Sequence, residues 1–320
     1  MSADSTAHDL VTLGEVLLRL SIPSPARFET ARQLDIQVGG AEANVAAACA
    51  RLGARTAWIS ALPANAWGDR VVHELRGHGV DCTFVRRVPD TRLGTYYLEY
   101  GVPPRPIRVL YDRRDSAFAK VGVDDLDWRP VRSARLVHLS GVTAALGDGP
   151  RALLRRAVQE ARDVSFDVNY RATLWTPEAA RAFVDTVLPV LRYLFLGEAE
   201  ARQVFELDGE PEAMIAALGR LAPKATVTLL RGAEGSLTLD RGRVVLPRRR
   251  HTVQMVDPIG AGDAFVAGFL WASLAGRAID DVVDVANAVA ALKCSTWGDI
   301  ALIGPGDVDD ALAGGSDVRR

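Results

Sequence analysis

Two glycines and an aspartate stand together in residues 256–265, which read Val-Asp-Pro-Ile-Gly-Ala-Gly-Asp-Ala-Phe and precede a run of small and apolar residues. Glycines at a helix start leave backbone N–H groups uncovered, so Gly260, Ala261 and Gly262 predict a cradle for a phosphate group. Asp263 follows in the first turn, beside whatever the cradle holds. A carboxylate base next to such a cradle is typical of phosphoryl transfer. Taken alone, the motif also fits an ordinary glycine-rich helix start.

A second motif, in residues 39–53, lies far upstream of the first. Gly39 and Gly40 end a β segment, and Asn44 stands in the first turn of an alanine-rich helix. Gly53 takes the place of a helix-ending glycine. On its own, this motif also fits the close packing of a helix on a sheet.

The elements that must position these motifs form an alternating series from about residue 130. Short apolar runs, typical of buried parallel strands, alternate with stretches of helical period. We expect strands at 136–139, 164–168, 193–196 and 226–230, and helices at 150–162, 177–190, 198–207 and 211–221. The series predicts an α/β fold. Residues 16–38 and 93–119 predict β-hairpins attached to the main sheet as a second small domain, and residues 304–320 look loose.

Composition narrows the class of partner. The 320 residues are 48% hydrophobic, and 38 basic residues nearly balance 40 acidic ones, so we expect neither nucleic acid nor a membrane surface as partner. Only three basic residues are lysines, which favours bidentate contacts by arginine or reflects a bias in genome composition. Cys49, Cys82 and Cys294 form no zinc or disulfide pattern. The N-terminus shows no signal peptide, and a cytoplasmic location is expected.

Together, the two glycine motifs resemble the paired signatures of the ribokinase-like (PfkB) carbohydrate kinases, from Gly14 to about Gly304. The resemblance implies a three-layer α/β sandwich with a mostly parallel sheet plus a small β-sheet lid. The lid would comprise residues 16–38 and 93–119, and the α/β domain residues 1–15, 39–92 and 120–320. It also implies ATP and Mg²⁺ as cofactors and a homo-oligomer formed through the lid.

Three segments resemble the 2-keto-3-deoxygluconate kinases within this family: residues 94–100, residues 108–117, and residues 167–171 with 174–175. A sugar acid needs a fixed cation with planar donors, and Arg171 and Arg113 are the candidates. Arg113 is also one arginine in an arginine-rich hairpin, and Tyr97 beside Tyr96 faces the other way. The implied substrate-binding residues are Gly39, Gly40, Asn44, Tyr96, Tyr111, Arg113, Arg171, Asp263 and Asp299.

The nucleotide side is expected at a glycine turn that follows the strand at 226–230. The resemblance implies nucleotide contacts from Asn169, Arg171, Arg231, Gly232, Gly235, Ser236, Gly260, Gly262 and Asn287. Asp257 and Glu200 would hold Mg²⁺, largely through water. The chain departs from the family pattern at Leu230, where a lysine is frequent, and at Gly197, where an asparagine is frequent.

The predicted reaction is attack of a terminal hydroxyl on the γ-phosphate of ATP, with Asp263 taking the proton and the N–H groups of 261–263 stabilising the transferred group. The chain has neither a P-loop motif nor a dinucleotide fingerprint. A non-catalytic sugar-binding relative would be expected to lack the base or the cradle. The main alternative is another acceptor, such as ketodeoxygalactonate, fructose or ribose.

Overall fold

A nine-stranded sheet forms the centre of the computed structural model, which describes residues 8–23, 25–101 and 104–314. Its inner parallel strands are short apolar runs that are largely buried on both faces, whereas the edge strands β5 and β13 carry exposed residues. Seven neighbouring strands are parallel, and β12 and β13 are antiparallel at one edge. In spatial order they are β13(Arg243–Val245), β12(Ser236–Asp240), β11(Thr226–Leu230), β10(Leu191–Gly197), β9(Val164–Asp167), β8(Leu136–Ser140), β1(Leu10–Leu13), β4(Thr56–Pro63) and β5(Val85–Val88).

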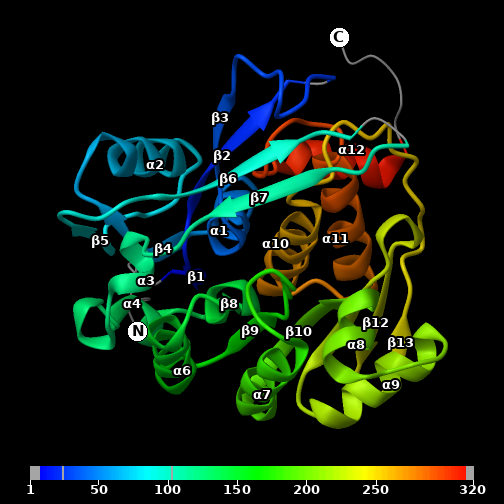
Figure 1. Ribbon diagram of the computed structural model, residues 1–320. Coiled ribbons are helices and arrows are strands. Elements are labelled where there is room, and N and C mark those ends of the chain that lie inside the picture. The colour runs from blue at the N-terminus through cyan, green and yellow to red at the C-terminus, as the bar shows by residue number, and fades with distance from the viewer. Residues whose placement is uncertain (1–7, 24, 102–103, 315–320) are drawn as a thin grey trace.

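Helices cover both faces of this sheet and give three layers (Figure 1). One face carries α3(Ala117–Lys120), α4(Arg129–Ser133), α5(Gly141–Ala144), α6(Asp148–Glu160), α7(Pro177–Val187), α8(Glu198–Phe205) and α9(Pro211–Leu221). The other carries α1(Ala41–Arg51), α10(Ala261–Leu274), α11(Ile279–Lys293) and α12(Pro305–Ala313), and α2(Ala66–Gly77) packs on α1 and β4. Short 3₁₀ turns lie at Val123–Asp125, Leu188–Val190 and Gly232–Glu234.

A second sheet of four strands lies across one side of the molecule, at the top of Figure 1. Its order is β3(Asp35–Gly39), β2(Leu17–Ile22), β6(Gly94–Glu99) and β7(Arg108–Asp112). The pairs β2–β3 and β6–β7 are antiparallel, and the parallel pair β2–β6 joins them. The expected hairpins therefore form a sheet of their own and do not extend the main sheet. The predicted fold class is confirmed, and the division of the chain into two domains stays a prediction.

The structure confirms the predicted βα series, with half of the ends exact and the others shifted by one to three residues. Gly53 follows the end of α1 at a φ of 100°, a backbone angle that favours glycine. The prediction that residues 304–320 are loose is wrong for 305–313, because α12 forms there and buries Val308 completely, and residues 315–320 lie outside the described part of the chain. The three cysteines are free and buried. No helix of the described residues is long and apolar enough to cross a membrane.

Candidate active site

A cleft of about 530 Å³ opens between the inner face of the small sheet and the start of α10. The loop after β9 forms a third side of it. Eleven of the predicted site residues line this cleft, although they come from distant parts of the chain. They are Gly39, Gly40, Asn44, Tyr96, Tyr111, Arg113, Asn169, Arg171, Gly260, Asp263 and Asp299.

Asp263 lies in the first turn of α10, half-buried, with its carboxylate facing α1. The side-chain amide of Asn44 donates to Asp263 Oδ2 at 2.7 Å, and the amide oxygen of Asn44 accepts from the N–H of Gly40 at 3.3 Å. Burial raises the pKa of Asp263 to about 6, against the Asn44 hydrogen bond and Arg171, which lower it. A base with this pKa is ionised near neutral pH and can still accept a proton. Asn44, predicted to bind substrate, orients the base.

The two cradle glycines serve different purposes. Gly260 caps α10 at a φ of 83°, and a Cβ there would lie 2.1 Å from the backbone oxygen of Asp299. Gly262 is exposed, and a Cβ there would meet no described protein atom within 4 Å. The N–H group of Ala261 donates to the backbone oxygen of Pro258 at 3.2 Å. The N–H groups of Gly262 and Asp263 therefore remain as donors for an anion. Gly260 shapes the turn, and Gly262 leaves open space beside those donors.

Asp299 and Tyr96 meet on the side of the cleft that the small sheet forms. The Tyr96 hydroxyl donates to Asp299 Oδ2 at 2.6 Å, and Arg19 donates to Asp299 Oδ1 at 2.6 Å. A Cβ at Gly39 would lie 2.3 Å from Asp299 Oδ2, so this contact requires glycine. The rings of Tyr96 and Tyr111 lie 5.9 Å apart and give the cleft an apolar wall.

Arg113 and Arg171 differ in their partners. Arg113 is buried, and its Nε donates to Glu15 Oε2 at 2.8 Å, so its charge is already paired. Of the two candidate cations, Arg113 is therefore already neutralised within the protein. Arg171 donates to the backbone oxygen of Tyr170 at 3.0 Å, and we find no carboxylate within ion-pair distance of it in the part of the chain that is described. Arg171 is the cation available to an acidic ligand.

The predicted magnesium role of Asp257 needs correction. Its side chain is completely buried, and it accepts hydrogen bonds from Arg19 at 2.7 Å, from the Tyr100 hydroxyl at 2.6 Å, and from two backbone N–H groups at 3.0 Å. These donors occupy the carboxylate, and it does not line the cleft. Asp257 stabilises the loop that leads into α10.

Oxygen atoms suited to a magnesium ion lie instead where the end of β9 meets the first turn of α8. Glu200 accepts from Tyr170 N–H at 2.5 Å and from Gly197 N–H at 2.6 Å. Burial, together with the charges of Glu200 and Asp263, raises the pKa of Asp167 well above its usual range. Asn169 is buried, and its side-chain oxygen has no hydrogen-bond partner. A divalent cation would relieve the repulsion between the carboxylates and satisfy this oxygen, so the residues fit Mg²⁺.

Asp167 is the first residue of the segment 167–171, but no role was predicted for it from the sequence. The signal that could have found it is its place at the carboxyl end of a buried strand, where ligands of parallel sheets bind. The described residues hold no cluster of three or more His, Cys, Asp or Glu able to cage a metal alone.

Five of the predicted nucleotide residues, Arg231, Gly232, Gly235, Ser236 and Asn287, meet at the turn between β11 and β12, outside the lining of the cleft. Asn287 of α11 donates to Ser236 Oγ at 2.9 Å, and a Cβ at Gly235 would lie 3.2 Å from Asn287 Oδ1. Arg231 and Gly232 precede them in the same glycine turn. Of the two departures, Leu230 packs against the core beside α10, and the Gly197 N–H is bound by Glu200. Neither supplies a side chain to the site.

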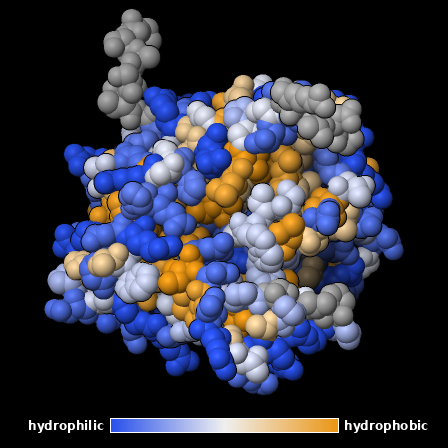
Figure 2. All heavy atoms as spheres, turned by 90° about the horizontal axis from the view of Figure 1, so that it is seen from above, coloured by the Kyte–Doolittle hydropathy of each residue, from blue (hydrophilic) through white to orange (hydrophobic). Residues whose placement is uncertain are grey.

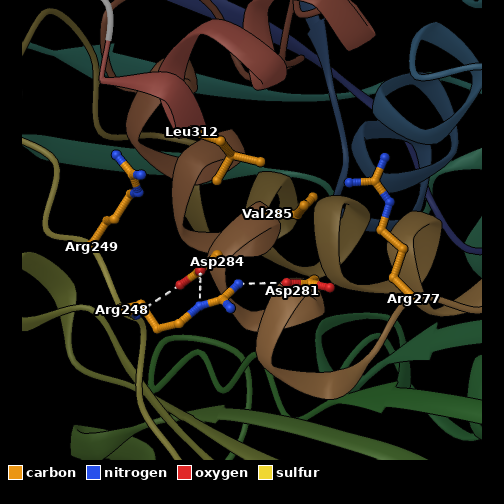
Figure 3. Close-up of a pocket in the computed structure, with 7 residues that line it drawn as sticks. All are labelled: Arg248, Arg249, Arg277, Asp281, Asp284, Val285 and Leu312. Carbon is orange, nitrogen blue, oxygen red and sulfur yellow. Dashed lines mark hydrogen bonds and ion pairs between the residues drawn. The ribbon is translucent and has the colours of Figure 1, made fainter.

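A larger hollow of about 790 Å³ lies by α11 and α12, away from the predicted residues (Figure 3). Arg248 contacts Asp281 at 2.5 Å and Asp284 at 2.6 Å there, so its charge is paired within the protein. Both aspartates of its lining are ion-paired with Arg248, and no glycine is among the described residues that line it. This hollow is therefore a weaker candidate for the active site than the cleft.

Known proteins share this sequence and this fold. Residues 7–303 match the family described as pfkB family carbohydrate kinase. The chain is 40% identical over 311 residues to a 2-dehydro-3-deoxygalactonokinase of Haloferax volcanii, a match covering 96% of this chain and 97% of that protein. It is 33% identical over 308 residues to a 2-dehydro-3-deoxygluconokinase of Thermoproteus tenax, covering 95% and 94%. The crystal structure of a 2-dehydro-3-deoxygluconokinase of Thermotoga maritima is similar with a TM-score of 0.91 and 31% identity, covering 96% and 99%.

Proposed function

The chain belongs to the pfkB family of carbohydrate kinases, and from this premise we propose that it transfers the γ-phosphoryl group of ATP to the terminal hydroxyl of 2-keto-3-deoxygluconate, also called 2-dehydro-3-deoxygluconate. One observation carries the proposal. A single cleft holds the base Asp263, the cap of the glycine cradle and the unpaired cation Arg171. A base beside an anion cradle suits phosphoryl transfer, and the free cation suits an acidic acceptor.

The reaction follows from this arrangement. The terminal hydroxyl of the acceptor lies against Asp263, which takes its proton as the oxygen attacks the γ-phosphorus. The new O–P bond forms as the bond between the γ-phosphorus and the ADP oxygen breaks, and the N–H groups at the start of α10 bind the transferring group. Asn44 holds the carboxylate in place through its 2.7 Å hydrogen bond. Closure of the small sheet over the acceptor would exclude water from the transfer.

ATP would lie along residues 231–236 with Asn287 beside its base or ribose, and Asn169 and Arg171 near its phosphates. Glu200, Asp167 and Asn169 would hold Mg²⁺, largely through water, and the bound ion would neutralise phosphate charge. The pKa of Arg171 is raised, because the nearby Tyr111, Glu200, Asp263 and Asp167 outweigh the effect of burial, which lowers it.

The acidic end of the acceptor would bind Arg171, and its carbon chain would lie on Tyr96 and Tyr111. Arg113 supports Tyr111, because its guanidinium lies 5.5 Å from the centre of the tyrosine ring. A neutral sugar would leave Arg171 without a partner, which makes it a poorer substrate.

The galactonate epimer is the second candidate. The relative with 40% identity is named a galactonokinase, and the one with 33% identity a gluconokinase. The two acids differ at one stereocentre, so the same base, cradle and cation would serve both. The choice between them lies in the hydroxyl contacts of the acceptor.

A coupled assay of ADP release tests the proposal. The panel contains both 2-keto-3-deoxy acids, with ribose, fructose and adenosine as neutral acceptors. We expect kcat/KM for at least one acid to exceed that for each neutral acceptor by about tenfold or more, since each 1.4 kcal/mol corresponds to one decade. Equal or better use of a neutral sugar would refute the acceptor class and leave the kinase assignment in place.

We also propose that the small sheet carries a homo-oligomer interface. Ile36, Leu20, Tyr97 and Leu110 are cross-strand neighbours in one row, on the face opposite Tyr96. Ile36 is 37% and Leu110 57% exposed. The view from above, onto the side where this sheet lies, shows apolar surface gathered on it (Figure 2). An exposed apolar row is best covered by a second copy of the same sheet.

Sedimentation of the wild type and of L110E tests the proposed interface. A wild type that is monomeric at micromolar concentration contradicts the proposal.

A further inference from the structure

Lys293 is a completely buried ammonium group to which the transfer reaction above gives no role. It is the last residue of α11, and its Nζ donates to the backbone oxygens of Asp257 at 2.9 Å and Thr296 at 3.4 Å. The other two lysines of the chain, Lys120 and Lys224, are exposed. Burying an ammonium group is costly unless it is paired. The cost indicates that this position needs the charge.

The two carbonyl groups that Lys293 binds belong to the two loops behind the cradle. Asp257 begins the turn that leads through Gly260 into α10, and Thr296 lies in the loop that leads to Asp299. A further bond joins the loops, from Gly298 N–H to the Asp257 carboxylate at 3.0 Å. The ammonium thus fixes the cradle turn from behind.

Lys293 also completes a buried balance of charge. Asp257 and Asp299 carry two negative charges close to the cradle, and Arg19 bonds to both of them at 2.7 and 2.6 Å. Arg19 supplies one positive charge, and Lys293 supplies the other. The backbone of Asp299 touches the cradle, because a Cβ at Gly260 would lie 2.1 Å from its oxygen. Without Lys293, one uncompensated negative charge would lie directly behind the site where the phosphoryl group binds.

We propose that Lys293 is a positioning residue of phosphoryl transfer, whose fixed charge behind the start of α10 makes the cradle attractive to the transferring group. The inference rests on the proposed function. It gives α11 a part in the reaction, although none of its residues lines the cleft.

The charges around the base agree with this role. Burial raises the pKa of Asp263, and Lys293 is among the groups that hold it down. Burial likewise lowers the pKa of Lys293, against Asp257 and Asp299. The charged and polar groups facing these two residues are Glu42 and Asn44 from α1, Arg19 from β2, Asp167 from β9, Arg171 from the loop after β9, Cys294 from the end of α11, and Asp257 and Asp299 from the two loops. Removing the ammonium charge should therefore raise the pKa of the base.

The test is K293M, which keeps the length of the side chain and removes its charge, with K224M as the same substitution at an exposed lysine. Both are assayed with the best acceptor of the wild type, so a wrong acceptor class would not affect the comparison. We expect kcat of K293M to fall about tenfold or more. This decrease should be smaller than the decrease caused by loss of a direct hydrogen-bond donor to the transition state. We expect KM for the acceptor to change less than threefold and the acidic limb of kcat to move to higher pH. K224M should match the wild type.

A second variant covers the case in which K293M does not fold. K293A leaves a hole lined by the Asp257 and Thr296 carbonyl oxygens, in which an ammonium ion can donate to both. Ammonium chloride should restore activity to K293A, and tetramethylammonium chloride at the same ionic strength should not. Folded K293M with wild-type kcat and pH profile would overturn the proposal. Loss of folding in both variants without rescue would show a purely structural lysine and would overturn it equally.

Discussion

Replacing Asn44 with alanine should move the acidic limb of the pH profile upward. In the wild type, Asn44 donates to the ionised carboxylate of Asp263 at 2.7 Å and so opposes the effect of burial, which raises the pKa of that group to about 6. A hydrogen bond to a charged group contributes roughly 1.5–3 kcal/mol, and one pKa unit corresponds to about 1.4 kcal/mol. The pKa of Asp263 in N44A should therefore rise by about one unit or more.

The size of the effect depends on pH in a defined way. With a pKa of about 6, the base is about half ionised at pH 6, and with a pKa of about 7 it is about one-tenth ionised there. N44A should lose about fivefold in kcat at pH 6 from this cause and only about twofold at pH 7. Near pH 8.5, where the base is ionised in both proteins, the remaining difference measures the loss of positioning alone.

The assay is ADP release at saturating ATP and acceptor between pH 5 and 9, with melting temperatures measured in the same buffers. N65A is the matched control, because Asn65 caps α2 by accepting from the N–H groups of Trp67 and Gly68, outside the cleft. We expect N65A to lose about 1 kcal/mol of stability and to keep the wild-type profile. A folded N44A whose acidic limb coincides with that of the wild type would refute the link between Asn44 and the base.

Four further substitutions separate the parts of the site. D263N keeps the size of the side chain and removes the base, so kcat should fall by roughly 10²-fold or more with little change in ATP affinity, and near wild-type turnover would assign the base elsewhere. G262V should fold normally, because its side chain meets open space, and should lose phosphate binding and turnover; G260A should lower the melting temperature, because its Cβ meets the backbone of Asp299. Unchanged ATP affinity and kcat in G262V would remove the cradle from the mechanism. R171L should raise KM for the sugar acid and narrow its advantage over neutral sugars, and an unchanged ratio of kcat/KM would show that another group binds the acid.

The local order of the chain was predictable where apolar period and glycine placement decide it. The strand Thr226–Leu230 and the helix Pro211–Leu221 occur at the predicted bounds, and α1 ends before Gly53 as expected. Each of these depends on residues that are close in sequence. The meeting of Asn44 with Asp263 was implied only through the family resemblance, because 219 positions separate them.

The errors arose where a charge is paired by a residue far along the chain. Arg113 is neutralised by Glu15, which lies 98 positions earlier, and Asp257 is held by Arg19, which lies 238 positions earlier. A sequence pattern shows the charge but not the partner that a fold brings to it. The C-terminal helix was missed for a related reason, because its stability comes from one buried contact face around Val308 and not from a strong repeating pattern.

The parallel pairing of β2 with β6 constrains how the chain can acquire its acceptor pocket. Residues 17–22 cannot pair with residues 94–99 until the intervening helices and strands have formed a crossover, and such contacts between distant residues are slow to form. The pocket also needs Asp299, which lies far beyond both strands in the sequence. A chain growing on the ribosome therefore has no complete acceptor pocket until residue 299 has joined the fold. An incomplete chain would have neither a closed pocket nor the Arg19 contacts that join it to the cradle, so truncation before residue 299 should abolish sugar phosphorylation without leaving a partly active fragment.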